Sequence, residues 1–452
     1  MKVMKWSAIA VAISAATTQL AMADAFVSDQ AESKGFIEDS HLTITNAATY
    51  FNRMSAGDGH HQDPHNARDP RDATWVIMGN YESGFTQGTV GFGVDAFGYL
   101  SLKLDGGDGH SGSGYTQANG SGEQQDDFGK AGGAVKVRIS KTELKYGDMQ
   151  PTAPVFAAGG TRIIPQVATG FQLQSSEIAG LDLEGGHFTS ATSPNTTHRD
   201  DIISTTYAGV EAKSADFVGG KYAITDNASV SLYGAELEDI WRQYYLNGNY
   251  TLPLGDSQSL GLDFNIYRTN DDGKAEAGNI NTTAWSLAAA YTISAHTFTL
   301  AYQKVHGDTP FDYAQFGSDS SGSGDSIFLA NSVQYSDFNG PGESSWQVRY
   351  DLNMAEFGVP GLTFMTRYIH GDNIDGTHTD LNGAYVKDDG TPKYGNNDSE
   401  HETDVEAKYV IQDGPAKDLS FRLRQAFHYG SDSTGGKQNE LRLVAQYPLS
   451  IL

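Results

Sequence analysis

Long runs of alternating apolar and polar residues constrain the fold of this chain more than any other feature. Between residues 89 and 105, Val90, Phe92 and Leu100 belong to an apolar set at every second position, and Asp95 lies in the polar set between them. Period-two alternation is typical of β-strands. A run of about 16 residues is long for a soluble strand, whose usual length is about 5 to 6. A tilted strand that rises out of a membrane fits this length better.

The same alternation returns in residues 260–266, 283–291 and 419–429. In the last of these runs, Arg422 and Arg424 alternate with leucines and aromatic residues. Arginine opposite leucine within one strand predicts one face in water and one in hydrocarbon, which is the pattern of a transmembrane β-barrel.

Candidate strands recur along the whole chain. There are about nineteen, whereas single-chain bacterial barrels have an even number with both ends on the periplasmic side. The weakest is residues 203–211, which falls inside an external loop when the short or Pro/Gly-marked links are taken as periplasmic turns. We therefore predict an all-β fold, a transmembrane antiparallel β-barrel of about 18 strands with long external loops. The candidates begin near residues 40, 74, 88, 131, 142, 170, 180, 203, 215, 228, 240, 258, 281, 295, 343, 362, 402, 418 and 439, and the links taken as periplasmic turns precede 215, 258, 295, 362 and 418.

The links between the candidate strands fall into a short and a long class. Long polar links occupy residues 54–73, 105–130, 150–169, 190–214, 307–342 and 371–401, and short ones include 140–141, 177–180, Ser214, 292–295 and 357–361. The link at 150–169 is unusual because Val155, Phe156, Ile163 and Ile164 make it too apolar for a freely solvated loop. We expect it to fold back into the lumen, where these groups would be buried.

The N-terminus has the features of a secretory signal. Lys2 and Lys5 precede a short apolar stretch, and Ala21-Met22-Ala23 forms a small-residue cleavage site. We expect residues 1–23 to be a signal peptide and residues 24–452 to form a single barrel domain. Nothing downstream matches the roughly 20 apolar residues of a spanning helix.

Composition excludes several classes of protein. The chain has no Cys, so an exported product gains no disulfide, and its net charge of −26 disfavours nucleic-acid binding. Only 38% of residues are hydrophobic, although Gly, Tyr and Phe number 52, 23 and 21. A barrel with a polar, water-filled interior accommodates this combination.

Several stretches resemble the OprD family of substrate-specific outer-membrane porins. They include GGAVKVRISK at 132–141 and NSVQYSDFNGPG at 331–342, and the similar stretches are residues 25–39, 81–105, 132–141, 150–188, 223–250 and 331–342. The resemblance implies a channel of about 18 strands, monomeric or loosely trimeric, whose external loops narrow the pore. It departs from the family mainly in the long loops.

Cations on the polar phase of the strands are candidates for the transport path. They are Arg53, Lys103, Lys136, Arg138, Lys221, Arg349, Arg367, Arg422, Arg424 and Arg442. Facing one lumen, they would form a track that attracts carboxylates. The resemblance implies a basic ladder, and Arg53, Arg422, Arg424 and Arg442 lie in matching motifs, YFNR, FRLRQ and NELR. Alternatively, each arginine pairs with a neighbouring acid and only balances the wall.

A constriction is expected where the inward loop carries a fixed charge. Arg162, in GGTRIIP, is our candidate there, because a guanidinium can grip a carboxylate with two hydrogen bonds. The resemblance places an acidic and phenolic pocket opposite, at Tyr207, Tyr313 and Asp337. A pore with one cationic and one anionic wall selects zwitterions. Alternatively, Asp337 anchors its own loop and the tyrosines serve packing.

These features predict passive, selective diffusion of small charged nutrients across a bacterial outer membrane, in contact with lipids and lipopolysaccharide. The resemblance favours basic amino acids and short peptides, with carbapenem-type antibiotics as passengers; other carboxylates such as aromatic acids, or oligosaccharides, are the alternatives. A barrel lipase would need catalytic Ser and His on the lipid-facing phase, which is apolar here, and an adhesin would need no narrowed lumen. We expect no catalytic activity and no cofactor.

A histidine-rich stretch in the first long link is the one candidate for metal binding. His60, His61 and His65 lie among aspartates, a composition that could hold zinc or copper. Gly57, Gly59 and other turn residues favour a flexible polar loop instead, so we predict no metal site.

Overall fold

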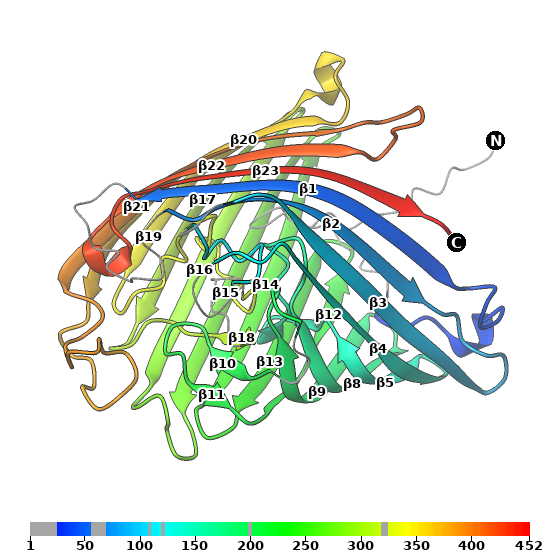
Figure 1. The fold of residues 1–452 in the computed structure, drawn as a ribbon, viewed down its shortest axis with the longest axis horizontal. Helices are drawn as coiled ribbons and strands as arrows, with labels where there is room; N and C mark the ends of the chain where they lie inside the picture. The colour runs from blue at the N-terminus through cyan, green and yellow to red at the C-terminus, as the bar shows by residue number, and fades with distance from the viewer. Residues whose placement is uncertain (1–24, 56–68, 107–109, 119–122, 198–200, 318–323) are drawn as a thin grey trace.

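The wall of the molecule is a closed antiparallel β-barrel (Figure 1). The computed structural model describes residues 25–55, 69–106, 110–118, 123–197, 201–317 and 324–452. The wall is a single sheet of 18 strands in which each strand pairs with the next along the chain, and the last strand pairs with the first. The predicted fold class and strand number are therefore confirmed.

The strands of the wall begin close to the positions that the alternation indicates. They are β1 (His41–Ser55), β2 (Arg71–Glu82), β3 (Val90–Asp105), β4 (Asp127–Ile139), β5 (Thr142–Met149), β8 (Val167–Ile178), β9 (Leu181–Thr192), β12 (Ala215–Thr225), β13 (Ala228–Leu237), β14 (Trp241–Gly255), β15 (Gln258–Asp271), β16 (Asn281–Ile293), β17 (His296–His306), β19 (Ser344–Asn353), β20 (Leu362–Asp375), β21 (Asn396–Val410), β22 (Ser420–Gly430) and β23 (Gln438–Ser450). Short 3-10 helices occupy Gln30–Glu32, Met354–Phe357 and Asp432–Thr434. None of the helices in these described segments is long and apolar enough to cross a membrane.

The two faces of the wall differ as the alternation predicts. On β22 the outward residues Phe421, Leu423 and Phe427 are exposed, whereas Ala426 and His428 face inward and are buried. An exposed apolar belt is the surface that a barrel presents to lipid. The inward positions are largely polar, so the same register that builds the sheet fills the interior with groups able to hydrogen-bond.

Short and long connections separate to opposite ends of the barrel. Tight turns join β4 to β5 at residues 140–141 and β8 to β9 at residues 179–180, where Gly180 adopts φ +77. The C-terminus lies at this short-turn end (Figure 1), where Ser450 pairs with Thr43 near the start of β1. One expectation is wrong: the link at Ser214 is not a short turn, because it is the last part of the long connection between β9 and β12. The short turn next to β12 lies at its other end, at residues 226–227, between β12 and β13.

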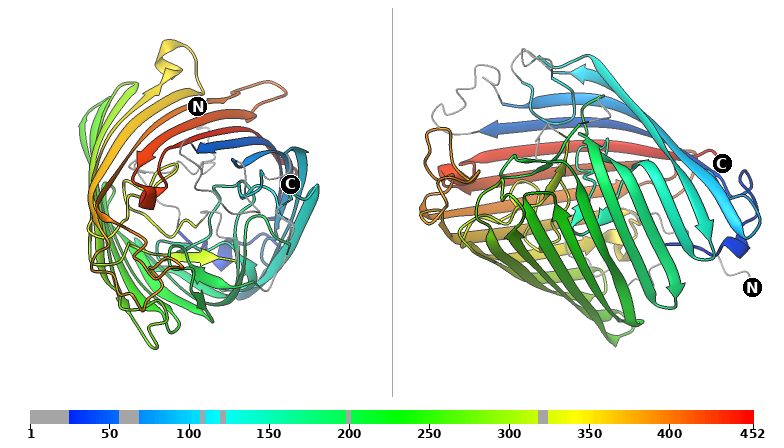
Figure 2. Two further views of the ribbon diagram at one scale, coloured as in Figure 1. Left: turned by 60° about the vertical axis from the view of Figure 1, so that its left-hand side comes forward. Right: turned by 90° about the horizontal axis from the view of Figure 1, so that it is seen from below.

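Parts of the long connections lie inside the ring of strands (Figure 2). Residues 203–211 are not part of the wall, as predicted; β10 (Ile203–Thr205) pairs with β11 (Glu211–Ala212) and with β18 (Ala314–Phe316) in a small separate sheet. A two-stranded ribbon, β6 (Thr152–Ala153) and β7 (Phe156–Ala157), forms within the connection at residues 150–166.

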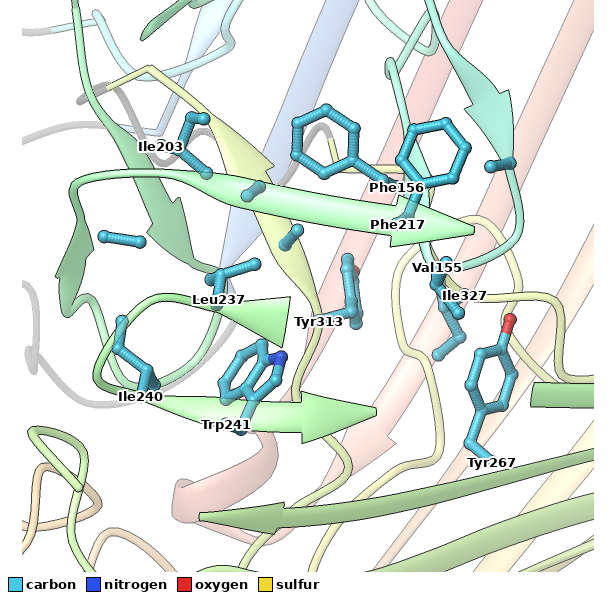
Figure 3. Close-up of a cluster of buried hydrophobic side chains, with 14 of the residues drawn as sticks. Val155, Phe156, Ile203, Phe217, Leu237, Ile240, Trp241, Tyr267, Tyr313 and Ile327 are labelled. Carbon is cyan, nitrogen blue, oxygen red and sulfur yellow. The ribbon is translucent and has the colours of Figure 1, made fainter. Parts of the chain in front are cut away.

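An apolar cluster fixes these inward loops to the wall. Phe156 is 1% exposed, and its ring lies 4.9 Å from that of Phe188 and 4.4 Å from that of Phe316. Figure 3 shows Phe156 and Tyr313 among side chains of the wall that include Phe217 and Trp241. Val155 and Ile164 are also buried. The predicted return of this loop into the lumen is confirmed, and its cause is the burial of apolar surface.

Candidate functional site

Arginines gather on one side of the lumen, along adjacent strands from β19 through β23 to β1. We call this set the arginine wall; it consists of Arg349, Arg367, Arg422, Arg424, Arg442 and Arg53. Strand register brings them together, because Arg349 is the cross-strand partner of Arg367 and Arg424 is that of Arg442. The inward direction predicted for each of these arginines is observed.

Each arginine of this wall has a carboxylate partner. Arg367 and Asp404 form an ion pair of 2.6 Å in which both side chains are 1% exposed. The Arg349 guanidinium lies 2.7 Å from Asp351. The wall arginines therefore balance acids, as the alternative interpretation expected, and their positive field is partly neutralised.

Exposure separates the arginines that a solute can reach from those that are buried. Glu406 holds both Arg422, at 2.8 Å, and Arg424, at 3.3 Å, and these side chains keep 24% and 12% of their surface exposed. Arg53 keeps 25%. Because Glu406 is shared by two arginines, this group keeps a net positive charge. Arg53, Arg422 and Arg424 are also the least buried arginines of the set, and we call them the accessible part of the arginine wall.

A second shared acid, Glu440, binds the arginines of β1 and β23. Its buried carboxylate accepts hydrogen bonds from Arg53 Nε at 2.8 Å and from Arg442 Nε at 2.6 Å. The guanidinium carbons of Arg53, Arg162 and Arg442 all lie within 5.4 to 5.8 Å of the centre of the Phe51 ring. We call these five residues the Glu440 cluster. It places three cations around one anion and one aromatic face.

Arg162 reaches this cluster from the inward loop. Its Nε donates to the Ser113 carbonyl oxygen at 2.7 Å, and the side chain is only 4% exposed. Burial lowers the pKa of Arg162, and Arg442 lowers it further, whereas Glu440 raises it. The guanidinium stays protonated at neutral pH. Arg162 therefore adds positive potential to the lumen while offering a solute little surface of its own.

The other predicted cations lie outside the arginine wall. Lys136 pairs with Asp95 at 2.6 Å, and Lys103 pairs with Asp126 at 2.7 Å. Arg138 donates to Gln30 and Ser28 of the N-terminal segment, and Lys221 lies on β12. The expected single track of cations is thus confined to the strands from β19 to β1.

On the loop side of the lumen, Asp337 lies in a pocket of hydroxyl groups. Its carboxylate accepts hydrogen bonds from Tyr207 Oη at 2.7 Å, Tyr313 Oη at 2.8 Å and Ser332 Oγ at 2.5 Å. Burial, followed by the charge of Asp337, raises the pKa of both Tyr207 and Tyr313 well above the ordinary value. The phenols are therefore neutral donors. Within the described ranges, no Lys, Arg or His forms an ion pair with Asp337.

Two long connections supply the Asp337 pocket, which comprises Asp337, Tyr207, Tyr313 and Ser332, and a third, between β20 and β21, packs against it. Asp312 ties them together, since it accepts the N–H groups of Tyr207 at 2.9 Å and Ala208 at 2.8 Å and the hydroxyl of Tyr385 at 3.1 Å. Burial raises the pKa of Asp312 to about 6. The pocket is thus preorganised by backbone contacts among residues far apart in sequence.

The pocket and the Glu440 cluster are joined by one short stretch of chain. The Gln334 carbonyl oxygen accepts from Arg442 Nη2 at 3.1 Å, and Gln334 Nε2 donates to the Glu440 carbonyl oxygen at 3.2 Å. Asp337 follows three residues later. Three residues of chain span at most about 11 Å. The backbone of Asp337 therefore lies within about 11 Å of that of Gln334, which contacts the Glu440 cluster.

Sequence reasoning placed the arginines but missed their partners. Glu440 and Glu406 share the inward phase of Arg442 and Arg424, and that parity was the available signal. Asp312 and Ser332 carry no periodic signal, because they lie in loops. No group of His, Asp or Glu in the described segments could hold a metal ion. His60, His61 and His65, the predicted polar loop, lie outside the described residues.

Comparisons with known proteins agree with this geometry. Residues 34–451 match the family model for the OprD family of outer membrane porins. The chain is 66% identical to Porin D of Pseudomonas aeruginosa over the full length of both, and 34% identical to the porin-like protein GalP of Pseudomonas putida, with 94% of this chain and 95% of that one covered. It also superposes on the crystal structure of Pseudomonas aeruginosa OprD with a TM-score of 0.81 and 62% identity, over 95% of this chain and 100% of that one.

Proposed function

Because the chain belongs to the OprD family of outer membrane porins, we propose that the solutes it passes are basic amino acids and short peptides, with carbapenem-type antibiotics as passengers. The protein is a substrate-specific channel of the bacterial outer membrane and not an enzyme. Diffusion through it is passive.

The observation that carries this proposal is the contrast between Asp337 and the arginine wall. Asp337 is surrounded by neutral hydroxyl donors, so an ammonium or guanidinium group would be its charged partner. Arg53, Arg422 and Arg424 remain accessible to a carboxylate. A solute that carries an α-carboxylate and a side-chain cation satisfies both regions, and lysine, arginine and peptides containing them have this character.

The accessible arginines by themselves support a second candidate, a channel for other carboxylates such as aromatic acids. Such solutes would use the arginine wall and leave the Asp337 pocket empty. The two candidates predict opposite orders of permeation for lysine and for an anion of similar size.

Liposome swelling with purified protein tests the proposal. We expect lysine, arginine and dipeptides containing them to enter faster than glutamate, benzoate or a disaccharide at the same osmotic strength. Lipid vesicles without protein give the background rate. Swelling rates that follow solute size alone, or that are faster for glutamate and benzoate, would reject the basic-solute assignment.

We further propose that residues 1–23 are a signal peptide removed on export, that residues 24–452 form the barrel domain, and that the barrel works in lipid and lipopolysaccharide as a monomer or a loose trimer. N-terminal sequencing of protein isolated from outer membranes should begin at Asp24. Crosslinking in membranes reads the oligomeric state.

A further inference from the structure

Asp337 lies in a short stretch of chain, residues 334–338, that we call the bridge segment. Its backbone is not held by regular strand pairing, and Phe338 adopts φ +50, a left-handed conformation that is costly for a residue with a side chain. Such a conformation persists only where the surroundings over-determine it. The groups that hold the bridge segment therefore set where Asp337 lies.

Glu402 of β21 holds the N-terminal half of this segment. Its carboxylate accepts the N–H of Tyr335 through Oε1 at 2.9 Å and the N–H of Ser336 through Oε2 at 2.9 Å. The side chain is 0% exposed, so no solute touches it. Two hydrogen bonds from consecutive amides to one carboxylate fix both the position and the orientation of the backbone immediately before Asp337.

Gln303 of β17 holds the other half. Its Nε2 donates to the carbonyl oxygens of Asp337 at 3.0 Å and Phe338 at 2.8 Å. Phe338 itself is fully buried, and Gly371 leaves room for it, because a Cβ at Gly371 would lie 2.9 Å from the Phe338 ring. The bridge segment is thus clamped by side chains from two strands that are separated by β19 and β20.

From this geometry we propose that Glu402 is a positioning residue for channel selectivity: by clamping the bridge segment it fixes the Asp337 carboxylate at a set distance from the Glu440 cluster. This deepens the proposed function and rests on it for the identity of the solute. Glu402 acts through Asp337 and not by contact with the solute. The next inward acid of β21, Asp404, makes the ion pair with Arg367, at 2.6 Å.

The substitution Glu402→Gln tests this assignment. The amide keeps one oxygen acceptor but turns an NH₂ group towards the second backbone N–H, so one of the two hydrogen bonds is lost. The matched control is Glu184→Gln, because Glu184 of β9 is also a buried inward acid, and its carboxylate accepts from Tyr233 at 2.9 Å and Gln172 at 3.0 Å instead of from the bridge segment. Folding of each variant is verified by heat-modifiable migration on gels.

Two readouts are needed, the reversal potential of single channels in a KCl gradient and the ratio of lysine to glutamate swelling rates. We expect Glu402→Gln to lower the preference for cations by about threefold and Glu184→Gln to leave it unchanged. In an Asp337→Asn background, Glu402→Gln should cause little further loss, because the residue that it positions has already lost its charge.

Three results would overturn the assignment. They are an unchanged cation preference in Glu402→Gln, an equal loss in Glu184→Gln, or full additivity with Asp337→Asn, which would indicate a direct field effect of the Glu402 charge. The reversal potential is measured in KCl alone, so it does not depend on which amino acid or peptide the channel passes. A channel that shows the expected coupling in KCl but no preference for lysine would therefore retain the positioning role and lose the proposed substrate.

Discussion

The arginine wall and the Asp337 pocket carry opposite charges and are built by opposite means. In the arginine wall, the register of paired strands determines which side chains lie next to each other. Arg367 and its acid Asp404, for example, are direct cross-strand partners. In the pocket, Tyr207 and Asp337 are separated by 130 residues and meet only because loops fold inward. The wall pairs each cation with an acid, whereas the pocket surrounds its acid with neutral donors.

This difference shows where stability and selectivity reside. A buried charge with a charged partner mainly secures the structure, since its field is neutralised close by. A carboxylate held by hydroxyl groups keeps a field that a passing cation can sense. We therefore expect substitutions in the wall to act most strongly on stability and substitutions in the pocket to act on selectivity.

The largest effect should come from Glu440→Gln. It leaves Arg53 and Arg442 without their shared carboxylate, next to Arg162, and unpaired buried charge of this kind costs about 3–5 kcal/mol. Urea unfolding in detergent micelles measures the loss. The control is Glu236→Gln at the exposed pair with Arg242, for which no measurable change is expected. Equal stability of the two variants would mean that the Glu440 cluster does not contribute to the free energy of unfolding as proposed.

Asp337→Asn should change selectivity without a comparable loss of stability. The three hydroxyl groups can still donate to the amide oxygen, but the charge that attracts a cation is gone. We expect the ratio of lysine to glutamate uptake to fall about fivefold, a change of about 1 kcal/mol. Liposome swelling measures the ratio. Equal losses for both amino acids would mean that Asp337 is only a loop anchor.

Arg162→Ala should have a smaller effect in the opposite sense. It removes a cation that contributes potential but exposes little surface, so uptake of carboxylate-bearing solutes should fall about twofold to threefold while the barrel still folds. Swelling with glutamate and with an uncharged sugar separates the charge effect from a change in pore width. Glutamate rates equal to those of the parent protein would remove Arg162 from the solute path.

The smallest effect is expected from Tyr207→Phe. It deletes one of the hydroxyl donors to Asp337 and leaves the ring, so the pocket keeps its shape and loses a hydrogen bond worth about 1 kcal/mol. The lysine preference should change by less than twofold. Tyr146→Phe on the lipid face, where the ring is exposed, is the matched control. A change as large as that of Asp337→Asn would show that the phenol itself contacts the solute.

The barrel could be predicted from the sequence because its rule is local. Side chains alternate strictly between two faces, so the exposure of Phe421 and Leu423 and the inward direction of Arg422 follow from position alone. The even number of strands in such barrels, together with the assignment of periplasmic turns, excluded residues 203–211 from the wall. That assignment was wrong at Ser214, where a short link was taken for a turn although it belongs to a long connection.

The contents of the lumen could be predicted only in part. The alternation of the strand predicted that Arg442 faces inward. It did not indicate that Glu440 would also bind Arg53 of β1, because the sharing of one acid by two arginines depends on how far their side chains reach. Arg162 was expected to grip a substrate carboxylate, yet its guanidinium donates to the Ser113 carbonyl of another loop and is only 4% exposed. Contacts between loops, such as those of Asp312, follow no period, so no pattern in the chain announces them.

The Glu440 cluster straddles the seam where the barrel closes, since Arg53 opposes Glu440 and Phe51 opposes Arg442 in the pairing of β1 with β23. These residues come from the first and last strands and meet only when the cylinder is complete. The cationic side of the lumen is thus completed only at the final step of assembly. The onset of anion attraction in a refolding experiment would therefore time the closure itself.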